Sequence, residues 1–169
     1  MKIANFVKIA WYGLHFGEEP PLTGPPAGVA GEKGAGTIFF TGCNLRCVYC
    51  QNYQISQENL GKKYSSEELA GLMLELQNQG ALNIDLVSPT IWAEPIKRAI
   101  ILAKARGLKL PIVWNSNAYE SVGMIKGLKG LVDIYLPDFK YGDDELTFKY
   151  SGVKDYVKKA KKSIREMFN

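Results

Sequence analysis

The chain has 169 residues, of which 46% are hydrophobic and 22% are charged, and its formal net charge is +4. This composition is typical of a globular protein and excludes disordered and fibrous chains, and so mild a charge does not require a nucleic-acid partner. No apolar run approaches the ~20 residues that a membrane-spanning helix needs, and the N-terminus lacks the pattern of a secretory signal. We therefore expect a cytoplasmic protein with no membrane partner.

In chain order, residues 1–36 are predicted to form an irregular N-terminal segment, because residues 13–36 contain four prolines and seven glycines. From residue 37 onward, short apolar runs alternate with amphipathic segments. The predicted strands are 37–40, 84–88, 110–114 and 131–136. The predicted helices, which begin at serine or proline signals or end at glycine, are 67–79, 94–105, 121–128 and 153–168.

This alternation predicts an α/β fold with a parallel sheet built from four βα units. A closed barrel of eight such units needs about 250 residues, so the expected fold is a (βα)4 half or partial TIM-type barrel. Residues 37–169 are predicted to form this one domain. In parallel α/β folds the functional residues lie at the carboxyl ends of the strands. The polar residues predicted there are Cys43, Ser88, Thr90, Asn115, Ser116, Asn117, Asp138 and Lys140.

The three cysteines, Cys43, Cys47 and Cys50, lie within eight residues. An odd and clustered set differs from a disulfide framework and indicates metal chemistry. Three thiolates on one loop can hold three corners of an iron–sulfur cubane, and the missing fourth cysteine would leave one iron open to a ligand. The alternatives are a zinc site completed by His15, the only histidine, an electron-transfer or cluster-carrier module, and buried inert cysteines.

The spacing C-x3-C-x-aromatic-C, with Tyr49 as the aromatic residue, resembles the signature of the radical S-adenosylmethionine (SAM) superfamily. The string TGCNLRCVYCQN is similar to activating enzymes of glycyl-radical enzymes, of the pyruvate formate-lyase-activating type. Together with the upstream HFGEEPPLTG, it resembles an uncharacterised branch of pyruvate formate-lyase-activating-like proteins. Members of that branch are longer, and this chain resembles their N-terminal part.

The resemblance implies that the three cysteines bind a [4Fe–4S] cluster and that SAM chelates its unique iron. The reduced cluster would then cleave SAM into methionine and a 5′-deoxyadenosyl radical. Tyr49 would pack beside the adenine, unless it is only a core aromatic. Ser88 and Thr90 stand where relatives carry a Gly-Gly-Glu segment that contacts the methionine amino group. They would contribute no charge there, and the alternative is a plain turn after the strand.

Asn115 and Ser116 align with an Asp-Thr pair that the activating enzymes use to hold substrate polar groups and a monovalent cation. Because Asn115 replaces the aspartate, that cation site has lost one charge. Asp138 matches the carboxylate after the fourth strand, and Lys140 matches a lysine that reaches toward the cofactor's carboxylate or ribose. The alternative is that Asp138 caps a turn and Lys140 is solvated.

The function that the resemblance implies is a radical SAM oxidoreductase that activates a glycyl-radical enzyme. The alternatives are a radical modifier of another peptide or of RNA, and a non-catalytic iron–sulfur or zinc module. The implied partners are SAM, a glycyl-radical enzyme or other polypeptide, and an electron donor such as flavodoxin or ferredoxin. Because four βα units leave one sheet edge unpaired, we also expect a homo-oligomer or a partner that completes the barrel.

Overall fold

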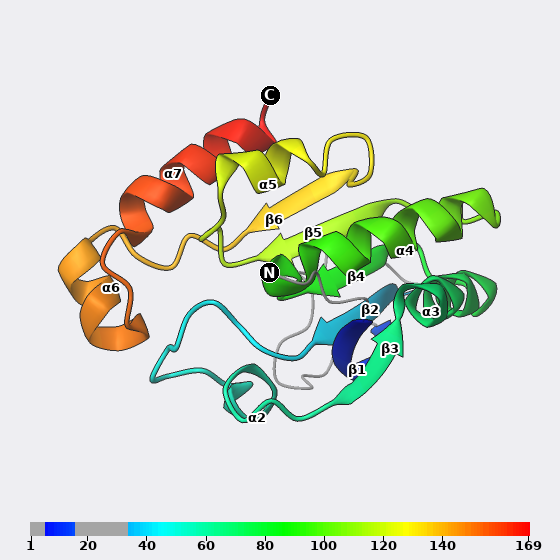
Figure 1. Ribbon diagram of the computed structural model, residues 1–169, viewed down its shortest axis with the longest axis horizontal. Helices are drawn as coiled ribbons and strands as arrows, with labels where there is room; N and C mark the ends of the chain where they lie inside the picture. Colours follow the sequence, from blue (N-terminus) through cyan, green and yellow to red (C-terminus); the bar gives the residue numbers. More distant parts are fainter. Residues whose placement is uncertain (1–5, 16–33) are drawn as a thin grey trace.

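The computed structural model describes residues 6–15 and 34–169. One mixed sheet of six strands, in the order β3-β1-β2-β4-β5-β6, forms the centre of the molecule (Figure 1). The strands are β1 Phe6–His15, β2 Ala35–Phe40, β3 Lys62–Ser65, β4 Ile84–Val87, β5 Ile112–Ser116 and β6 Ile134–Pro137. The α-helices are α2 Tyr53–Ser56, α3 Ser66–Asn78, α4 Ala93–Ala105, α5 Val122–Lys126, α6 Asp144–Ser151 and α7 Tyr156–Met167. A short 3-10 helix, Thr90–Trp92, precedes α4.

The strands β2, β4, β5 and β6 are parallel neighbours, and within the described part of the chain the sheet does not close into a barrel. Gly36 pairs with Ile84, and Ile84 pairs with Ile112, so the registers follow one another across the sheet. This confirms the predicted α/β fold and is consistent with a partial TIM-type barrel. Because the four parallel strands run the same way, their carboxyl ends meet at one edge of the sheet.

The strand β1 differs from the expectation for the N-terminal segment. Residues 1–36 were predicted to be irregular, and this is wrong for Phe6–His15, which pair antiparallel with both β2 and β3. The alternation of buried Val7 and Ile9 with the more exposed Lys8 is typical of a half-buried strand. Residues 16–33 lie outside the described residues.

The core lies between the sheet and helices α3 and α4. Side chains of alternate strand residues face these helices, and they include Ile38, Phe40, Leu86 and Trp114, all at most 1% exposed. The helix α3 begins with a capping box, in which the Ser65 hydroxyl accepts from the backbone N–H of Glu68 and the Glu68 carboxylate accepts from the backbone N–H of Ser65. Within residues 6–15 and 34–169, no helix has both the length and the apolar character to traverse a bilayer.

The opposite face of the sheet carries one buried carboxyl group. Asp85 alternates with Ile84 and Leu86 on β4, so its side chain projects away from the α3–α4 core, and it is 0% exposed. Among the described residues, neither carboxyl oxygen has a hydrogen-bond partner within bonding geometry. Burial raises the pKa of Asp85 to about 7, and the nearby Asn115 side chain offsets only part of that effect.

Candidate functional site

A cavity of about 690 Å³ opens at the carboxyl ends of the four parallel strands. Its lining includes residues of the loop that follows β2 and of the segment that leads from β6 to α6. Figure 1 shows both segments at the same end of the sheet. Its volume is in the range of small-molecule sites, about 300–1,000 Å³. The lining residues that carry polar or sulfur side chains are Cys43, Cys47, Tyr49, Cys50, Gln51, Asn52, Ser56, Ser88, Asn115, Ser116, Asn117, Asp138 and Lys140.

All three cysteines are unpaired thiols on residues 41–52, called here the cluster loop, and all three line the cavity. Cys47 is buried, while Cys43 and Cys50 are partly exposed. The loop leaves β2 at Gly42, whose φ of +87° favours glycine and where a Cβ would lie 2.6 Å from Ile91 Cδ1. A glycine is therefore needed at the point where the chain turns from the strand into the loop.

Polar groups approach each of the three sulfur atoms. Cys43 Sγ accepts from the backbone N–H of Leu45 and from Asn117 Nδ2, both at 3.4 Å. Cys50 Sγ lies 3.2 Å from Ser56 Oγ. Burial and the neighbouring cysteines raise the pKa of Cys43, whereas its two hydrogen bonds lower it in part. The sulfurs therefore lie in an environment that includes donors able to stabilise thiolates.

The third sulfur is held by the C-terminal end of α6. Ser151 Oγ donates to Cys47 Sγ at 2.9 Å. The same turn accepts two backbone hydrogen bonds from the cluster loop, from Arg46 N–H to the Ser151 carbonyl at 3.1 Å and from Val48 N–H to the Tyr150 carbonyl at 2.9 Å. The cluster loop is thus docked on α6 by main-chain and side-chain contacts together.

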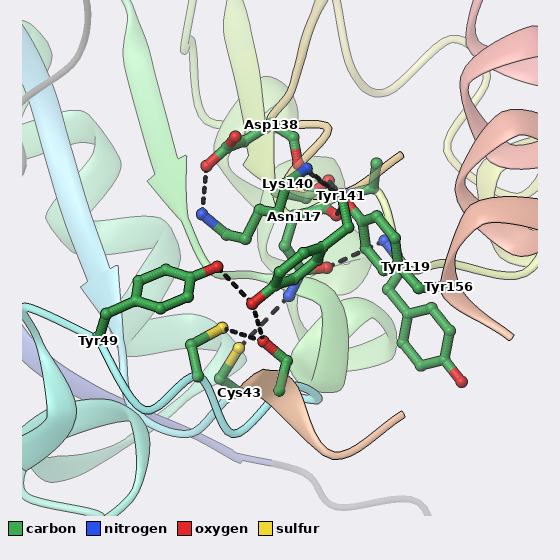
Figure 2. A network of polar contacts seen from close by, with 12 residues as sticks. Cys43, Tyr49, Asn117, Tyr119, Asp138, Lys140, Tyr141 and Tyr156 are labelled. Atoms are coloured by element: carbon green, nitrogen blue, oxygen red, sulfur yellow. Dashed lines mark hydrogen bonds and ion pairs between the residues drawn. The ribbon is translucent and has the colours of Figure 1, made fainter. Parts of the chain in front are cut away.

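Asp138 and Lys140 form an ion pair in the lining of the cavity. Burial alone would lower the pKa of Lys140, but the hydrogen bond and charge of Asp138, with the nearby cysteines, raise it overall. Tyr156 links the backbone at Lys140 to the residue that follows β5. Its hydroxyl accepts from the Lys140 backbone N–H at 2.8 Å and lies 2.9 Å from the Asn117 carbonyl. Figure 2 shows this network, in which Asn117 also reaches Cys43.

Glu120 is a buried carboxylate that accepts hydrogen bonds from residues of β5 and from the turn that follows β4. It accepts hydrogen bonds from Trp114 Nε1 at 2.7 Å, from the Ser116 hydroxyl at 2.9 Å and from the Thr90 hydroxyl at 3.0 Å. Burial raises the pKa of Glu120, and these hydrogen bonds lower it in part. Glu120 therefore positions residues that follow β4 and complete β5, without lining the cavity itself.

The structure brings most of the residues predicted from the sequence into one place. The three cysteines and six of the seven predicted cofactor-binding residues line the cavity; the six are Tyr49, Ser88, Asn115, Ser116, Asp138 and Lys140. Thr90 is not among the lining residues, because its hydroxyl is directed to Glu120. His15 belongs to β1, and its side chain lies outside the described part of the structure.

Sequence reasoning missed Ser151, Tyr141 and Glu120. Asn117 was predicted among the polar residues at the strand ends but was given no role; it directly follows β5 and contacts Cys43. Ser151 lies 104 residues from Cys47 and belongs to no motif. Only the three-dimensional structure relates it to the cysteines.

The donor set fits an iron–sulfur cluster. Three thiols face one cavity, and thiolates are the ligands that such clusters select. Within residues 6–15 and 34–169, no three His, Cys, Asp or Glu side chains gather closely enough to chelate a single ion. This does not bear on a cubane, because each of its thiolates binds a different iron.

Comparison with known proteins gives the family. Residues 37–169 match the model of the radical SAM superfamily. The chain belongs to this superfamily. It is also similar to an uncharacterized protein of Methanocaldococcus jannaschii, MJ0674, with 34% identity over 163 residues that cover 89% of this chain and 44% of the relative. The chain thus spans less than half the length of the curated relative that it matches.

Radical SAM proteins typically combine a [4Fe–4S] cluster with SAM in an oxidoreductase-type radical reaction. In this radical SAM chain, the signature cysteines and the strand ends that follow them line the same cavity. The match to the superfamily includes β2 and the strands parallel to it.

Proposed function

We propose that this chain binds a [4Fe–4S] cluster through Cys43, Cys47 and Cys50 and takes part in the reductive cleavage of SAM. The observation that carries the proposal is the convergence of three thiols, all from one loop, on a cavity at the carboxyl ends of four parallel strands. When bound, the cluster would supply the electron for reductive cleavage of SAM into methionine and a 5′-deoxyadenosyl radical. The three cysteines would hold it and would leave one coordination position for SAM.

The residues of the cavity have distinct roles in this proposal. Lys140, which is held by Asp138 in the lining of the cavity, would bind the carboxylate or ribose of SAM. The side chain of Asn115 would contact its polar groups from the end of β5, and Ser116, whose hydroxyl donates to Glu120, would contribute the atoms that line the cavity. Tyr49, which is 52% exposed, would present its ring to the adenine.

The residues after β4 contribute less directly. Ser88, whose φ of +57° turns the chain out of the strand, places its polar groups at the cavity wall and would contact the methionine amino group. Thr90 would act through this turn, because its own hydroxyl donates to Glu120.

Anaerobic reconstitution with iron and sulfide tests the proposal. We expect a reduced-cluster EPR signal that changes on addition of SAM, with 5′-deoxyadenosine as a product. Cys50→Ala should lose most of the iron, whereas Ser56→Ala, which changes the neighbouring side chain, should retain it. Retention of zinc without any cluster, or a cluster signal indifferent to SAM, would contradict the proposal and favour a non-catalytic metal module.

Within radical SAM chemistry, the version we propose is activation of a glycyl-radical enzyme. It is supported by the similarity of the string TGCNLRCVYCQN to activating enzymes; modification of another peptide or of RNA is the alternative. The partners would be the glycyl-radical enzyme and an electron donor such as flavodoxin or ferredoxin. The test is incubation of the reduced protein and SAM with a glycyl-radical enzyme from the same genome. A glycyl-radical doublet in the EPR spectrum supports the proposal, and SAM cleavage without the doublet contradicts it.

The unpaired edge of β6 indicates a site where a further partner could associate. Among the described residues, β6 pairs only with β5, and its Ile134 is 40% exposed. An unpaired strand edge favours association with another strand. We propose that this edge pairs with a second copy or with a segment that extends the sheet. Light scattering measures the mass in solution, and a monodisperse monomer would contradict pairing between two copies.

A further inference from the structure

A chain of three hydroxyl groups ends on the sulfur of Cys47. The Tyr49 hydroxyl donates to the Tyr141 hydroxyl, which lies 2.6 Å from Ser151 Oγ, and Ser151 Oγ donates to Cys47 Sγ at 2.9 Å. Figure 2 shows the hydroxyls of Tyr49 and Tyr141 facing each other beside the sulfur atoms. Each hydroxyl has only one proton to donate. Because the Ser151 proton is directed to the sulfur, Tyr141 donates to Ser151, and all three bonds run toward Cys47.

The end of this chain is buried and held in place. Ser151 is 1% exposed and Tyr141 is 9% exposed. Ser151 is the last residue of α6, and its carbonyl accepts from the backbone N–H of Arg46. The Ser151 backbone is therefore fixed by the docking of the cluster loop, and its side chain is covered from solvent. In such a low-dielectric position, successive hydrogen bonds polarise and strengthen one another.

The contact with Cys47 differs from those at the other two sulfurs. Cys43 Sγ accepts its two hydrogen bonds at 3.4 Å, and Cys50 Sγ lies 3.2 Å from Ser56 Oγ, which can be either donor or acceptor. The Ser151 contact is shorter than these, and its donor is buried. Among the described residues, the Ser151 hydroxyl thus makes the closest polar contact with any of the three cysteine sulfurs.

A donor at a ligand sulfur changes the reduction potential of an iron–sulfur cluster. Reduction adds one electron and so increases the negative charge on the cluster and its thiolates. A hydrogen bond to a thiolate stabilises the more negative state more strongly, because hydrogen bonds to charged acceptors strengthen with the charge. Donors at the sulfurs therefore favour the reduced cluster.

We propose that Ser151 is a positioning residue that raises the reduction potential of the cluster bound at Cys47, and that Tyr141 and Tyr49 strengthen its hydrogen bond. The inference rests on the proposed function in that it requires the cluster. One electron enters the cluster from a low-potential one-electron donor, and no proton is transferred. Ser151 keeps its proton and its hydrogen bond in both states.

The test is a redox titration of the anaerobically reconstituted protein, with dithionite as the reductant and the EPR signal of the reduced cluster as the readout. In Ser151→Ala the equilibrium constant for one-electron reduction should fall about tenfold, which is a potential about 59 mV more negative. Ser151→Thr keeps the hydroxyl and should restore most of the potential. Tyr141→Phe leaves Ser151 in place and should give a smaller change of the same sign.

Thr147→Val is the matched control. Thr147 is also buried on α6, but its hydroxyl donates to the Asp143 carbonyl at 2.7 Å and contacts no sulfur. This variant should keep the wild-type potential. An unchanged potential in Ser151→Ala at wild-type iron content would overturn the inference, as would an equal change in Thr147→Val.

Iron content separates the two proposals. If the wild-type protein takes up no cluster, the proposed function fails and the inference fails with it. If the wild type takes up the cluster and Ser151→Ala does not, Tyr141→Phe decides: a more negative potential supports the inference, and an unchanged potential overturns it.

Discussion

Replacement of Asp85 by asparagine should stabilise the protein, and more so at high pH. Burial raises the pKa of this carboxyl from its ordinary 3.8 to about 7 in the folded state. The folded protein therefore holds the Asp85 proton more tightly than the unfolded chain does. It follows that the stability contributed by this group falls as pH rises from about 4 to about 7, and the full cost applies above pH 7.

The size of the effect follows from the same pKa difference. A difference of about 3 pKa units, at about 1.4 kcal/mol each, gives about 4 kcal/mol at pH 8 and about 1.5 kcal/mol at pH 5. Asparagine has nearly the same shape and no charge at either pH. The gain in the free energy of unfolding of Asp85→Asn over wild type should therefore grow by about 2–3 kcal/mol between these two pH values.

Urea denaturation of both proteins at pH 5 and pH 8 measures this gain. Taking the difference between variant and wild type at each pH cancels the titration of other groups, including Glu120, whose pKa burial also raises. Glu58→Gln is the control, because Glu58 is exposed and a surface substitution should change stability by less than about 0.5 kcal/mol. A gain for Asp85→Asn that is equal at the two pH values would refute the reasoning.

Three other variants test the structure. Ser65→Ala removes the capping box of α3 and should lower the free energy of unfolding in urea by about 1 kcal/mol; no change would show that the box does not stabilise the helix. Gly61→Ala would place a Cβ 2.3 Å from Thr41 Oγ1 at a φ of +142°, so calorimetry should show a loss of about 3 kcal/mol. Glu120→Gln keeps the size of the side chain but replaces one acceptor oxygen by a donor amide. It should lower the free energy of unfolding by about 2 kcal/mol and the thermal midpoint with it. A thermal midpoint at the wild-type value would contradict the role assigned to Glu120.

The parallel part of the fold could be predicted because its signals are local. The strands β4, β5 and β6 are short apolar runs, and α3 and α4 have serine or proline at their starts and glycine just after their ends. The strand β1 was missed, because the many breakers that follow it dominated the interpretation of the first 36 residues. The strand β3 has the sequence KKYS, and its pairing depends on β1 rather than on apolar residues of its own.

The candidate site also contains some residues that the sequence could predict and others that it could not. The cysteines could be found because they form a motif, and Asp138 could be found because it follows a strand whose end must join the others. Ser151 and Tyr141 could not, since they act through contacts with residues about a hundred positions away. The position of α6 against the cluster loop is set by tertiary packing, for which the sequence of α6 contains no periodic signal.

The docking of the cluster loop on α6 fixes an order of events during synthesis. The three thiols emerge from the ribosome well before Ser151, which is 104 residues after Cys47. At about 5–20 residues per second, Ser151 is added about 5–20 seconds after Cys47, so the thiols are made well before their supporting helix exists. During that interval Arg46 and Val48 lack the carbonyls that hold the loop in the folded protein. The cluster loop therefore reaches its docked arrangement only after α6 has been synthesised and has folded.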